Sequence, residues 1–370
     1  MKRFCKIFSA VLALLMISGC AGKGGSDEPT ASASAMSEYS EAAEVFNETE
    51  CVSETAVSTA NRRETTVSAS KNPSTAAEKS TAATAVKATV KTTEKETEKA
   101  TKAQTAAATE KSEKGDGVII GLNLVLFGCG RDEIISVMGN PTESVSERLK
   151  NGGKLESLVY AADYGRLAVF QLLDGSFAAF YTCARDTIVT DGSDSLSLKS
   201  GGETKFGKTR IQVYADSEKG GKVYALWAKY DGFSYEPSEL DGLGGQERLI
   251  FHATNAVRAI NGLAPLKYSQ DASESARLHC EDMAKREYFA HDTPEGKTCA
   301  ERMSRQGIKY TVCGENLGAG YMGAFDLVDG WYNSHGHRIN MLADDYKYIG
   351  VAMTAGNEKY SFYSAQNYYG

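Results

Sequence analysis

The sequence predicts an α+β protein in which two folded regions follow a long polar segment. In the last third of the chain, apolar residues recur at helical spacing in four segments and then alternate along two segments near the C-terminus. In the middle third, short alternating apolar runs are separated by turns that contain glycine, which is typical of strands. The segment before both regions is low in complexity and is not expected to fold.

Length and charge limit the kinds of protein that this chain can be. Its 370 residues are enough for two domains, and the hydrophobic fraction of 42% is enough for packed cores. The formal net charge of −7 argues against a nucleic-acid-binding surface. We therefore expect no nucleic-acid partner.

Residues 1–20 have the features of an export signal. Lys2 and Arg3 precede an apolar run from Ile7 to Ile17, which is short for a mature membrane-spanning helix. The run ends in Ile-Ser-Gly-Cys20, which resembles the bacterial lipobox and implies that Cys20 receives a diacylglyceryl anchor. The alternative is an ordinary signal peptide with a chance cysteine. A second apolar segment of 18 or more residues is missing, so we expect no multi-pass membrane protein.

Residues 21–116 are predicted to be a disordered tether. Ala, Thr, Ser, Lys and Glu dominate this segment, and Tyr39 and Phe46 are its only aromatic residues. Such a composition cannot bury enough apolar surface to offset the entropy lost on ordering. We expect the tether to hold the folded regions away from the membrane.

Residues 117–237 are predicted to form a small α+β domain. Apolar residues at helical spacing predict a helix from Arg131 to Met138, which Gly139-Asn140-Pro141 ends. Asp174-Gly175 predicts a hairpin between two strands. Residues 118–127 are predicted to be extended and partly apolar, and strands are predicted at 158–160, 167–173 and 177–183. A second β unit is predicted at 196–198 and 222–230, with a turn at Gly201-Gly202. Clustered ionisable residues are missing, so we expect a structural or interaction module.

Residues 231–245 are rich in Gly, Pro and acidic residues and mark the boundary to a second domain at 246–370. Helical spacing predicts helices at 246–261, 271–286, 298–306 and 324–334, and alternation predicts strands at 348–355 and 360–368. A further strand at 309–313 would complete a short sheet that is covered by helices on both faces. We expect the two domains to rest against each other.

Several short motifs follow one another in this second domain. His291 ends a Phe-Ala-His run, Gly-Glu315-Asn comes next, Trp331 lies in the fourth helix, and Gly-His337-Arg precedes a closing Gln366-Asn-Tyr. The ordered set resembles a bacterial CAP domain, whose superfamily includes the cysteine-rich secretory proteins, antigen 5 and the plant pathogenesis-related proteins. The resemblance covers about 125 residues and implies a three-layer α-β-α sandwich. Residues 117–237 are similar to a small domain that often precedes CAP domains in Gram-positive proteins.

The resemblance also implies a ligand cavity. In the family two histidines and two glutamates line it, and by motif His291, Glu315 and His337 take three of these places. The second glutamate belongs three residues after Trp331, where this chain has Ser334. This departure removes a carboxylate and weakens any two-acid mechanism. The implied ligands are extracellular lipids, cell-wall components, or small molecules derived from a host.

Two kinds of hydrolase remain as alternatives to a binding module. Two histidines and a glutamate (His291, Glu315, His337) form a ligand set known from catalytic zinc sites, so zinc is the candidate cofactor. Cys313 precedes Glu315 by two residues, where His291 or His337 could activate it as a nucleophile. A structural, adhesin-like role is the third alternative.

The remaining cysteines and histidines can be interpreted as structural residues. Six cysteines lie outside the leader, and the sequence leaves open whether they form disulfides or buried thiols: Cys51, Cys129, Cys183, Cys280, Cys299 and Cys313. His279 lies on the inner face of a predicted helix, where we expect a core histidine with its hydrogen bonds satisfied. The favoured hypothesis is an exported lipoprotein on the outer face of a bacterial cell membrane, or one released from it, that binds an extracellular ligand without catalysis.

Overall fold

The computed structural model describes residues 115–191, 194, 196, 201–320 and 323–370. The predicted export signal with Cys20, the tether up to residue 114 and most of the predicted strand at 196–198 lie outside the described residues. Within the described part, no helix is both long enough and apolar enough to cross a membrane.

The first described region, residues 115–240, consists mainly of β-sheet. A seven-stranded antiparallel sheet has the order β3-β4-β5-β6-β10-β9-β8, and a three-stranded sheet has the order β2-β1-β7. We call this the N-terminal region. Its elements are β1 Gly117–Ile120, β2 Asn123–Leu126, α3 Arg131–Met138, β3 Glu143–Arg148, β4 Lys154–Tyr160, η1 Tyr164–Arg166, β5 Ala168–Leu173, β6 Ser176–Thr182, β7 Thr187–Thr190, β8 Gly202–Phe206, β9 Thr209–Asp216, η2 Ser217–Lys219, β10 Lys222–Tyr230 and η3 Pro237–Glu239.

Local sequence accounts for several of these elements. Asp174 and Gly175 both have positive φ, at 50° and 84°, which is the backbone that a two-residue hairpin turn between β5 and β6 needs. The helix α3 has the predicted bounds. The strands β3, β7, β8 and β9 lie where no strand was predicted. β3 and β8 are the edges of the large sheet and carry many exposed polar residues, so the apolar signal of a strand is weak there.

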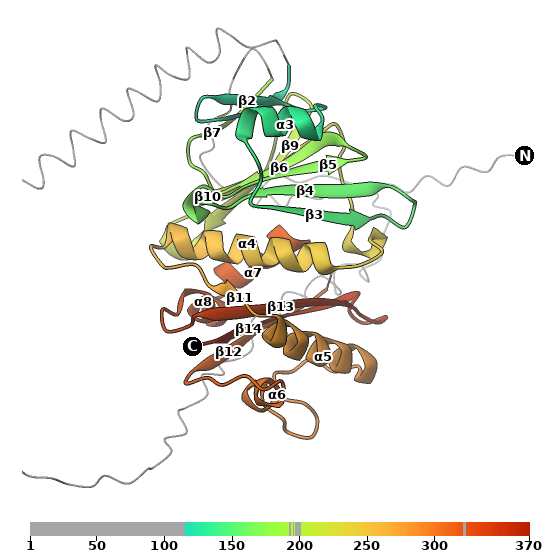
Figure 1. Cartoon of the computed structure of the whole chain (residues 1–370), viewed down its shortest axis with the longest axis vertical. Coiled ribbons are helices and arrows are strands. Elements are labelled where there is room, and N and C mark those ends of the chain that lie inside the picture. Colours follow the sequence, from blue (N-terminus) through green and yellow to red (C-terminus); the bar gives the residue numbers. More distant parts are fainter. Residues whose placement is uncertain (1–114, 192–193, 195, 197–200, 321–322) are drawn as a thin grey trace, which may run out of the picture. The chain divides into compact units, whose positions relative to one another are not determined.

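The second described region, residues 244–370, is a three-layer α-β-α sandwich, as the sequence predicted. Its four-stranded sheet has the order β11-β13-β14-β12, with α4 and α7 over one face and α5 and α6 over the other (Figure 1). We call this the C-terminal region. Its elements are α4 Gly244–Ile260, β11 Lys267–Tyr268, α5 Gln270–Arg286, α6 Cys299–Arg305, β12 Cys313–Ala319, α7 Ala324–Asn333, α8 His335–Leu342, β13 Tyr348–Ala355 and β14 Phe362–Tyr369.

The helix α5 packs very closely on the sheet at one glycine. A Cβ atom on Gly350 of β13 would lie 2.1 Å from backbone atoms of Ala272 and Ser273 in α5. A real side chain cannot fit at that distance, so any other residue would push the helix away from the sheet. Ser273 then accepts a hydrogen bond from the backbone N–H of Val351 at 2.9 Å, which fixes the helix against the strand.

Three elements of the C-terminal region correct the sequence-based prediction, and the first is the short strand β11, which lies where no strand was predicted. The strand expected at 309–313 instead begins at Cys313 and continues to Ala319, so Glu315 and Asn316 lie within β12. The segment from His335 to Leu342, for which no helix was predicted, forms α8. The Gly-Glu-Asn-Leu-Gly sequence of β12 has little strand propensity, and seven antiparallel residue pairs with β14 impose the extended backbone.

Aromatic side chains join the two regions. The rings of Tyr181 and Phe325 stack with centroids 3.8 Å apart, and Trp227 meets the same Phe325 edge to face at 5.4 Å. Tyr181 and Trp227 belong to the N-terminal sheet, whereas Phe325 lies in α7. One apolar cluster includes buried residues of both regions and continues across this contact, so the expectation that the two domains rest against each other holds.

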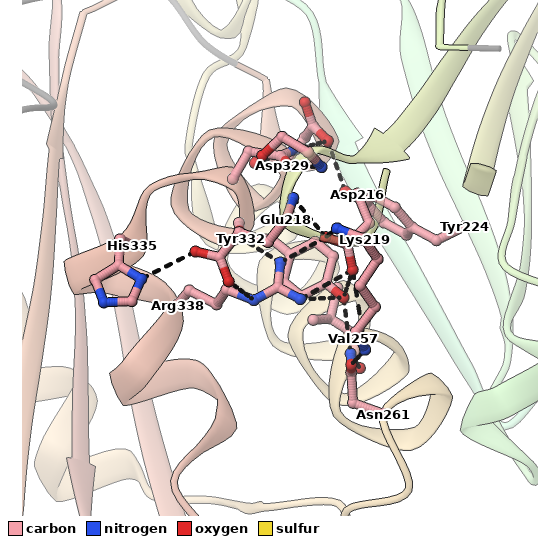
Figure 2. Close-up of polar contacts among 12 residues, drawn as sticks. Asp216, Glu218, Lys219, Tyr224, Val257, Asn261, Asp329, Tyr332, His335 and Arg338 are labelled. Atoms are coloured by element: carbon pink, nitrogen blue, oxygen red, sulfur yellow. Dashed lines mark hydrogen bonds and ion pairs between the residues drawn. The ribbon is translucent and has the colours of Figure 1, made fainter. Parts of the chain in front are cut away.

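A buried ion pair lies at one end of the contact between the regions. Arg338 of α8 donates hydrogen bonds to both carboxylate oxygens of Asp216, at 3.0 and 2.9 Å, and the Tyr332 hydroxyl donates to the same carboxylate at 2.6 Å. Figure 2 shows the Arg338 guanidinium between Asp216 and Glu218, with His335 on the far side of Glu218. Although burial raises the pKa of Asp216, the bonds from Arg338 and Tyr332 hold it below the ordinary value.

Two carboxylates of α7 also face the N-terminal region. The Tyr214 hydroxyl donates to Asp326 and the Tyr224 hydroxyl donates to Asp329, both at 2.7 Å. Burial raises the pKa of Asp329 to about 6. These two acids are therefore part of the contact between the regions, and α7 is covered on both sides.

Candidate functional site

A buried carboxylate is the centre of the candidate site. Glu315 lies in β12 with 2% of its side chain exposed. One of its oxygens is 3.0 Å from Nδ1 of His291, and the other accepts a hydrogen bond from Arg302 at 2.6 Å. Both oxygens are thus engaged, one by an imidazole and one by a guanidinium. The structure therefore brings two of the predicted site residues, His291 and Glu315, into direct contact.

Glu315 is held in its charged form. Burial by itself raises the pKa of this carboxyl, but the hydrogen bond from His291 and the charge of Arg302 outweigh burial and lower it to about 2. Since an ionised carboxylate can only accept, Nδ1 of His291 must be the donor in their hydrogen bond. The other ring nitrogen, Nε2, is not used in the contact with Glu315, and 28% of the His291 side chain is exposed.

Arg302 was not singled out from the sequence, yet it fixes the loop that carries His291. Besides Glu315, its guanidinium binds the carbonyl oxygens of His291 at 2.6 Å and Lys297 at 2.9 Å. The residue lies in α6, whose start is fixed by reciprocal hydrogen bonds between Thr298 and Glu301. That capping signal predicts the helix, but nothing local marks Arg302 as the partner of a carboxylate 13 residues away.

The other two predicted site residues form a second pair. The Oγ of Ser334 is 2.8 Å from Nδ1 of His337, across the junction between α7 and α8. Burial and the charge of His291 lower the pKa of His337 to about 4, so its imidazole is neutral at physiological pH.

Two asparagines hold the second pair against the first. Asn316, next to Glu315 and fully buried, donates to the backbone carbonyl of His337 at 3.1 Å. Asn340 of α8 donates to the carbonyl of Glu315 at 3.1 Å and to the side-chain oxygen of Asn316 at 3.0 Å. The unpredicted helix α8 is thus the element that positions His337 beside β12.

The other histidines have different places. His335 is exposed over 81% of its side chain and pairs with Glu218 of the N-terminal region, outside the site. Trp331 is fully buried and donates to the carbonyl of Leu317 at 2.8 Å. His279 is buried, but only one of its nitrogens has a partner, so the expected satisfied core histidine is not found.

The arrangement does not fit the zinc site that the sequence allowed. Across the described residues, no group of three or more His, Cys, Asp or Glu side chains is placed to hold a metal ion. Glu315 uses both oxygens for His291 and Arg302, and the guanidinium of Arg302 would repel a cation there. We therefore derive no chemistry from a metal at His291, Glu315 and His337.

The thiols are not arranged as nucleophiles. The five cysteines of the described part, Cys129, Cys183, Cys280, Cys299 and Cys313, are all free, and Cys51 lies outside it. Burial raises the pKa of Cys313, and the charge of Glu315 raises it further, so the reactive thiolate form is suppressed. The site thus combines an ionised buried carboxylate, a neutral imidazole and a serine hydroxyl that is hydrogen-bonded to that imidazole.

Comparison with known proteins agrees with this architecture. Residues 251–368 match the family model described as CAP, the Cysteine-rich secretory protein family. The uncharacterized protein YkwD of Bacillus subtilis is 33% identical over 144 residues, which are 39% of this chain and 55% of YkwD. The uncharacterized membrane protein YlbC of the same organism is 35% identical over 107 residues, which are 29% of this chain and 31% of YlbC. The chain thus spans about half of the first relative and about a third of the second.

Two solved structures share the fold. An extracellular protein containing an SCP domain from Bacillus anthracis matches with a TM-score of 0.51 and 21% identity, over 66% of this chain and 93% of its own. A cysteine-rich secretory protein from Staphylococcus aureus matches with a TM-score of 0.50 and 17% identity, over 66% and 91%. Residues 251–368 are about a third of this chain, so both matches also include residues of the N-terminal region.

Proposed function

Because residues 251–368 form a CAP domain, we propose that this protein is an exported surface protein whose CAP domain binds an extracellular ligand without catalysis. The ligand cavity would consist of His291, Glu315, Ser334 and His337. The solved relatives of this fold are named as an extracellular and a secretory protein, which supports export. The proposal includes a lipid anchor at Cys20, which lies outside the described residues.

One observation carries the non-catalytic part of the proposal. Both oxygens of Glu315 are engaged, and its pKa of about 2 is far from the pH at which a general base or acid is effective. His337, with a pKa of about 4, is neutral and bound to Ser334. Such groups can exchange hydrogen bonds with a ligand, but they lack the tuned pKa that proton transfer needs.

The chemistry of the four residues favours one of the three ligand classes. His291, Ser334 and His337 all carry groups that donate or accept hydrogen bonds, so a cavity lined by them would be polar. Sugar hydroxyls of a cell-wall component complement such groups better than acyl chains do. We therefore expect wall glycan to bind in preference to a lipid or a small host-derived molecule.

The test is co-sedimentation of the purified exported chain with isolated cell-wall sacculi and, separately, with phospholipid vesicles. We expect His337→Ala to lose wall binding and His335→Ala, two residues away and outside the site, to retain it. Binding to vesicles but not to sacculi would contradict the wall ligand. Release of soluble fragments from sacculi by the wild type, but not by His337→Ala, would contradict the non-catalytic function and support the hydrolase.

The anchor has its own test in cells. Cells fed a labelled fatty acid should transfer label to the wild-type protein, and Cys20→Ser should abolish the transfer and move the protein from the membrane fraction to the medium. An unlabelled wild-type protein would instead support an ordinary, cleaved signal peptide.

A further inference from the structure

A pocket of about 280 Å³ lies between α5, the loop before α6 and α6 itself. Its wall includes Ser275 and His279 of α5 and Arg302 of α6. None of the four residues of the proposed ligand cavity lines it. One bound water occupies about 30 Å³ of liquid volume, so the pocket has room for something larger than a bridging water.

Three buried polar atoms in this wall lack a hydrogen-bond partner among the described residues. They are Oγ of Ser275, Nδ1 of His279 and Nε of Arg302. Ser275 and His279 are each 1% exposed and Arg302 is 9% exposed. A buried polar atom without a partner is unfavourable and uncommon in folded proteins. Three of them around one pocket indicate a site built for a polar ligand.

The neighbouring hydrogen bonds determine whether each of these three atoms acts as a donor or as an acceptor. Nε2 of His279 is 2.9 Å from the carbonyl oxygen of Ala290, which can only accept, so Nε2 carries the proton. Burial lowers the pKa of His279 and keeps it neutral, so Nδ1 is an acceptor that requires a donor. Both terminal nitrogens of Arg302 already have partners, and its Nε–H is a donor that requires an acceptor. The Ser275 hydroxyl can serve either way.

Charge at the rim favours an anion. Lys297 and Arg305 line the pocket, and neither makes an ion pair with a described residue. Two acidic residues, Asp282 and Glu295, also line the pocket, and both pair with Arg286, at 3.4 and 2.6 Å. Leu278, which is 43% exposed, adds an apolar contact at the opening. The pocket therefore suits a small anion with a short apolar part.

We propose that this pocket binds a small carboxylate that carries a hydroxyl or amino group on the neighbouring carbon. The carboxylate would accept from Nε of Arg302 and from Ser275, while the hydroxyl or amine donates to Nδ1 of His279. A 2-hydroxy acid and a free amino acid share this chemistry. The site is separate from the proposed wall-binding cavity, so its failure would leave the proposed function standing.

The probes are lactate, alanine and acetate, added to the purified exported chain labelled with ¹⁵N at histidine. The readout is the Nδ1 resonance of His279, assigned by its disappearance in His279→Asn. We expect lactate or alanine to shift this resonance saturably. Acetate lacks the donor and should bind about tenfold more weakly, the loss that one unmade buried hydrogen bond produces. Whichever of lactate and alanine binds more tightly distinguishes a hydroxy acid from an amino acid.

Three variants locate the binding. Ser275→Ala should weaken it about tenfold, whereas Ser304→Ala on the exposed side of α6 should leave it unchanged. Lys297→Gln keeps the buried atoms and should weaken binding several-fold through the lost rim charge. Urea unfolding of Ser275→Ala verifies that it is folded.

Several outcomes would overturn the proposal. If neither lactate nor alanine shifts the His279 resonance, the pocket is not a carboxylate site. If acetate binds as tightly as both, the donor to His279 plays no part. Equal losses in Ser275→Ala and Ser304→Ala would place the binding elsewhere on the molecule.

Discussion

The substitution Asp216→Asn would remove a single negative charge from the contact between the two regions without changing the size of the side chain. In the native structure, Arg338 and Tyr332 together direct three hydrogen-bond donors at the Asp216 carboxylate. The side chains of Arg338 and Asp216 are only 6% and 4% exposed. The Asn amide has one acceptor oxygen, and its NH₂ group would face a donor. The buried guanidinium would lose its main counter-charge.

The expected loss of stability follows from burial. Removal of one partner from a buried ion pair costs about 3–5 kcal/mol. Arg338 retains a contact with Glu218 at 3.1 Å, so we expect the lower end of that range. At about 2–4 °C per kcal/mol for a folded unit of this size, a loss of about 3 kcal/mol lowers Tm by roughly 6–12 °C.

Urea unfolding followed by tryptophan fluorescence would measure this loss. The chain has two tryptophans, Trp227 in the N-terminal region and Trp331 in the C-terminal region, so one probe reports from each side of the contact. Glu218→Gln is the matched control, because Glu218 is 38% exposed and its contribution should be below about 1 kcal/mol. A stability of Asp216→Asn within about 0.5 kcal/mol of the wild type, the range of ordinary surface substitutions, would refute the reasoning.

Two further substitutions test other parts of the contact: one at Glu147 of β3, which accepts a hydrogen bond from Gln246 of α4 at 3.0 Å, and one at Phe325 of α7. Burial raises the pKa of Glu147 from 4.5 to about 7, so the folded state holds a proton that the unfolded state releases between these pH values. Wild-type stability should therefore carry a contribution from Glu147 that falls as pH rises from about 4.5 to about 7, by roughly 3 kcal/mol at 1.36 kcal/mol per pKa unit. Glu147→Gln should remove that contribution in urea unfolding at pH 5 and pH 8, and an unchanged pH dependence would contradict this. Phe325→Ala should lower the free energy of unfolding by about 3–5 kcal/mol, because it removes the ring that stacks on Tyr181. It should also shift the fluorescence emission of Trp227 to the red, because Phe325 packs against that ring. A stable variant with unchanged emission would show that the stack is dispensable.

The helices of the C-terminal region were predictable because their signal is local. The apolar spacing in α4 and α5 is present in the sequence whatever the rest of the chain does, and the ends of the observed helices lie within two residues of the prediction. The extent of β12 was not predictable in this way. Its Gly-Glu-Asn-Leu-Gly sequence becomes a strand only because β14 is beside it, and β14 lies about 50 residues further on.

In the candidate site, too, local motifs were predictable and contacts set by tertiary packing were not. Motif order identified His291, Glu315, Ser334 and His337, and the structure joins them in two hydrogen-bonded pairs. Arg302 escaped notice because a lone arginine on a short helix is usually a solvated charge. Its role depends on the loop at His291 and on the depth of Glu315, which are set by tertiary packing.

The two-sided burial of α7 has a consequence for protein engineering. On one side of this helix Trp331 packs toward β12, and on the other Asp326 and Asp329 accept hydrogen bonds from tyrosine hydroxyls of the N-terminal region. A chimera that carried the C-terminal region alone onto a different scaffold would remove the donors to these acids and expose Phe325 to water. The natural unit for transplantation is therefore the pair of regions, cut ahead of β1, and a library that exchanges C-terminal regions alone would need to redesign the outer face of α7 in every member.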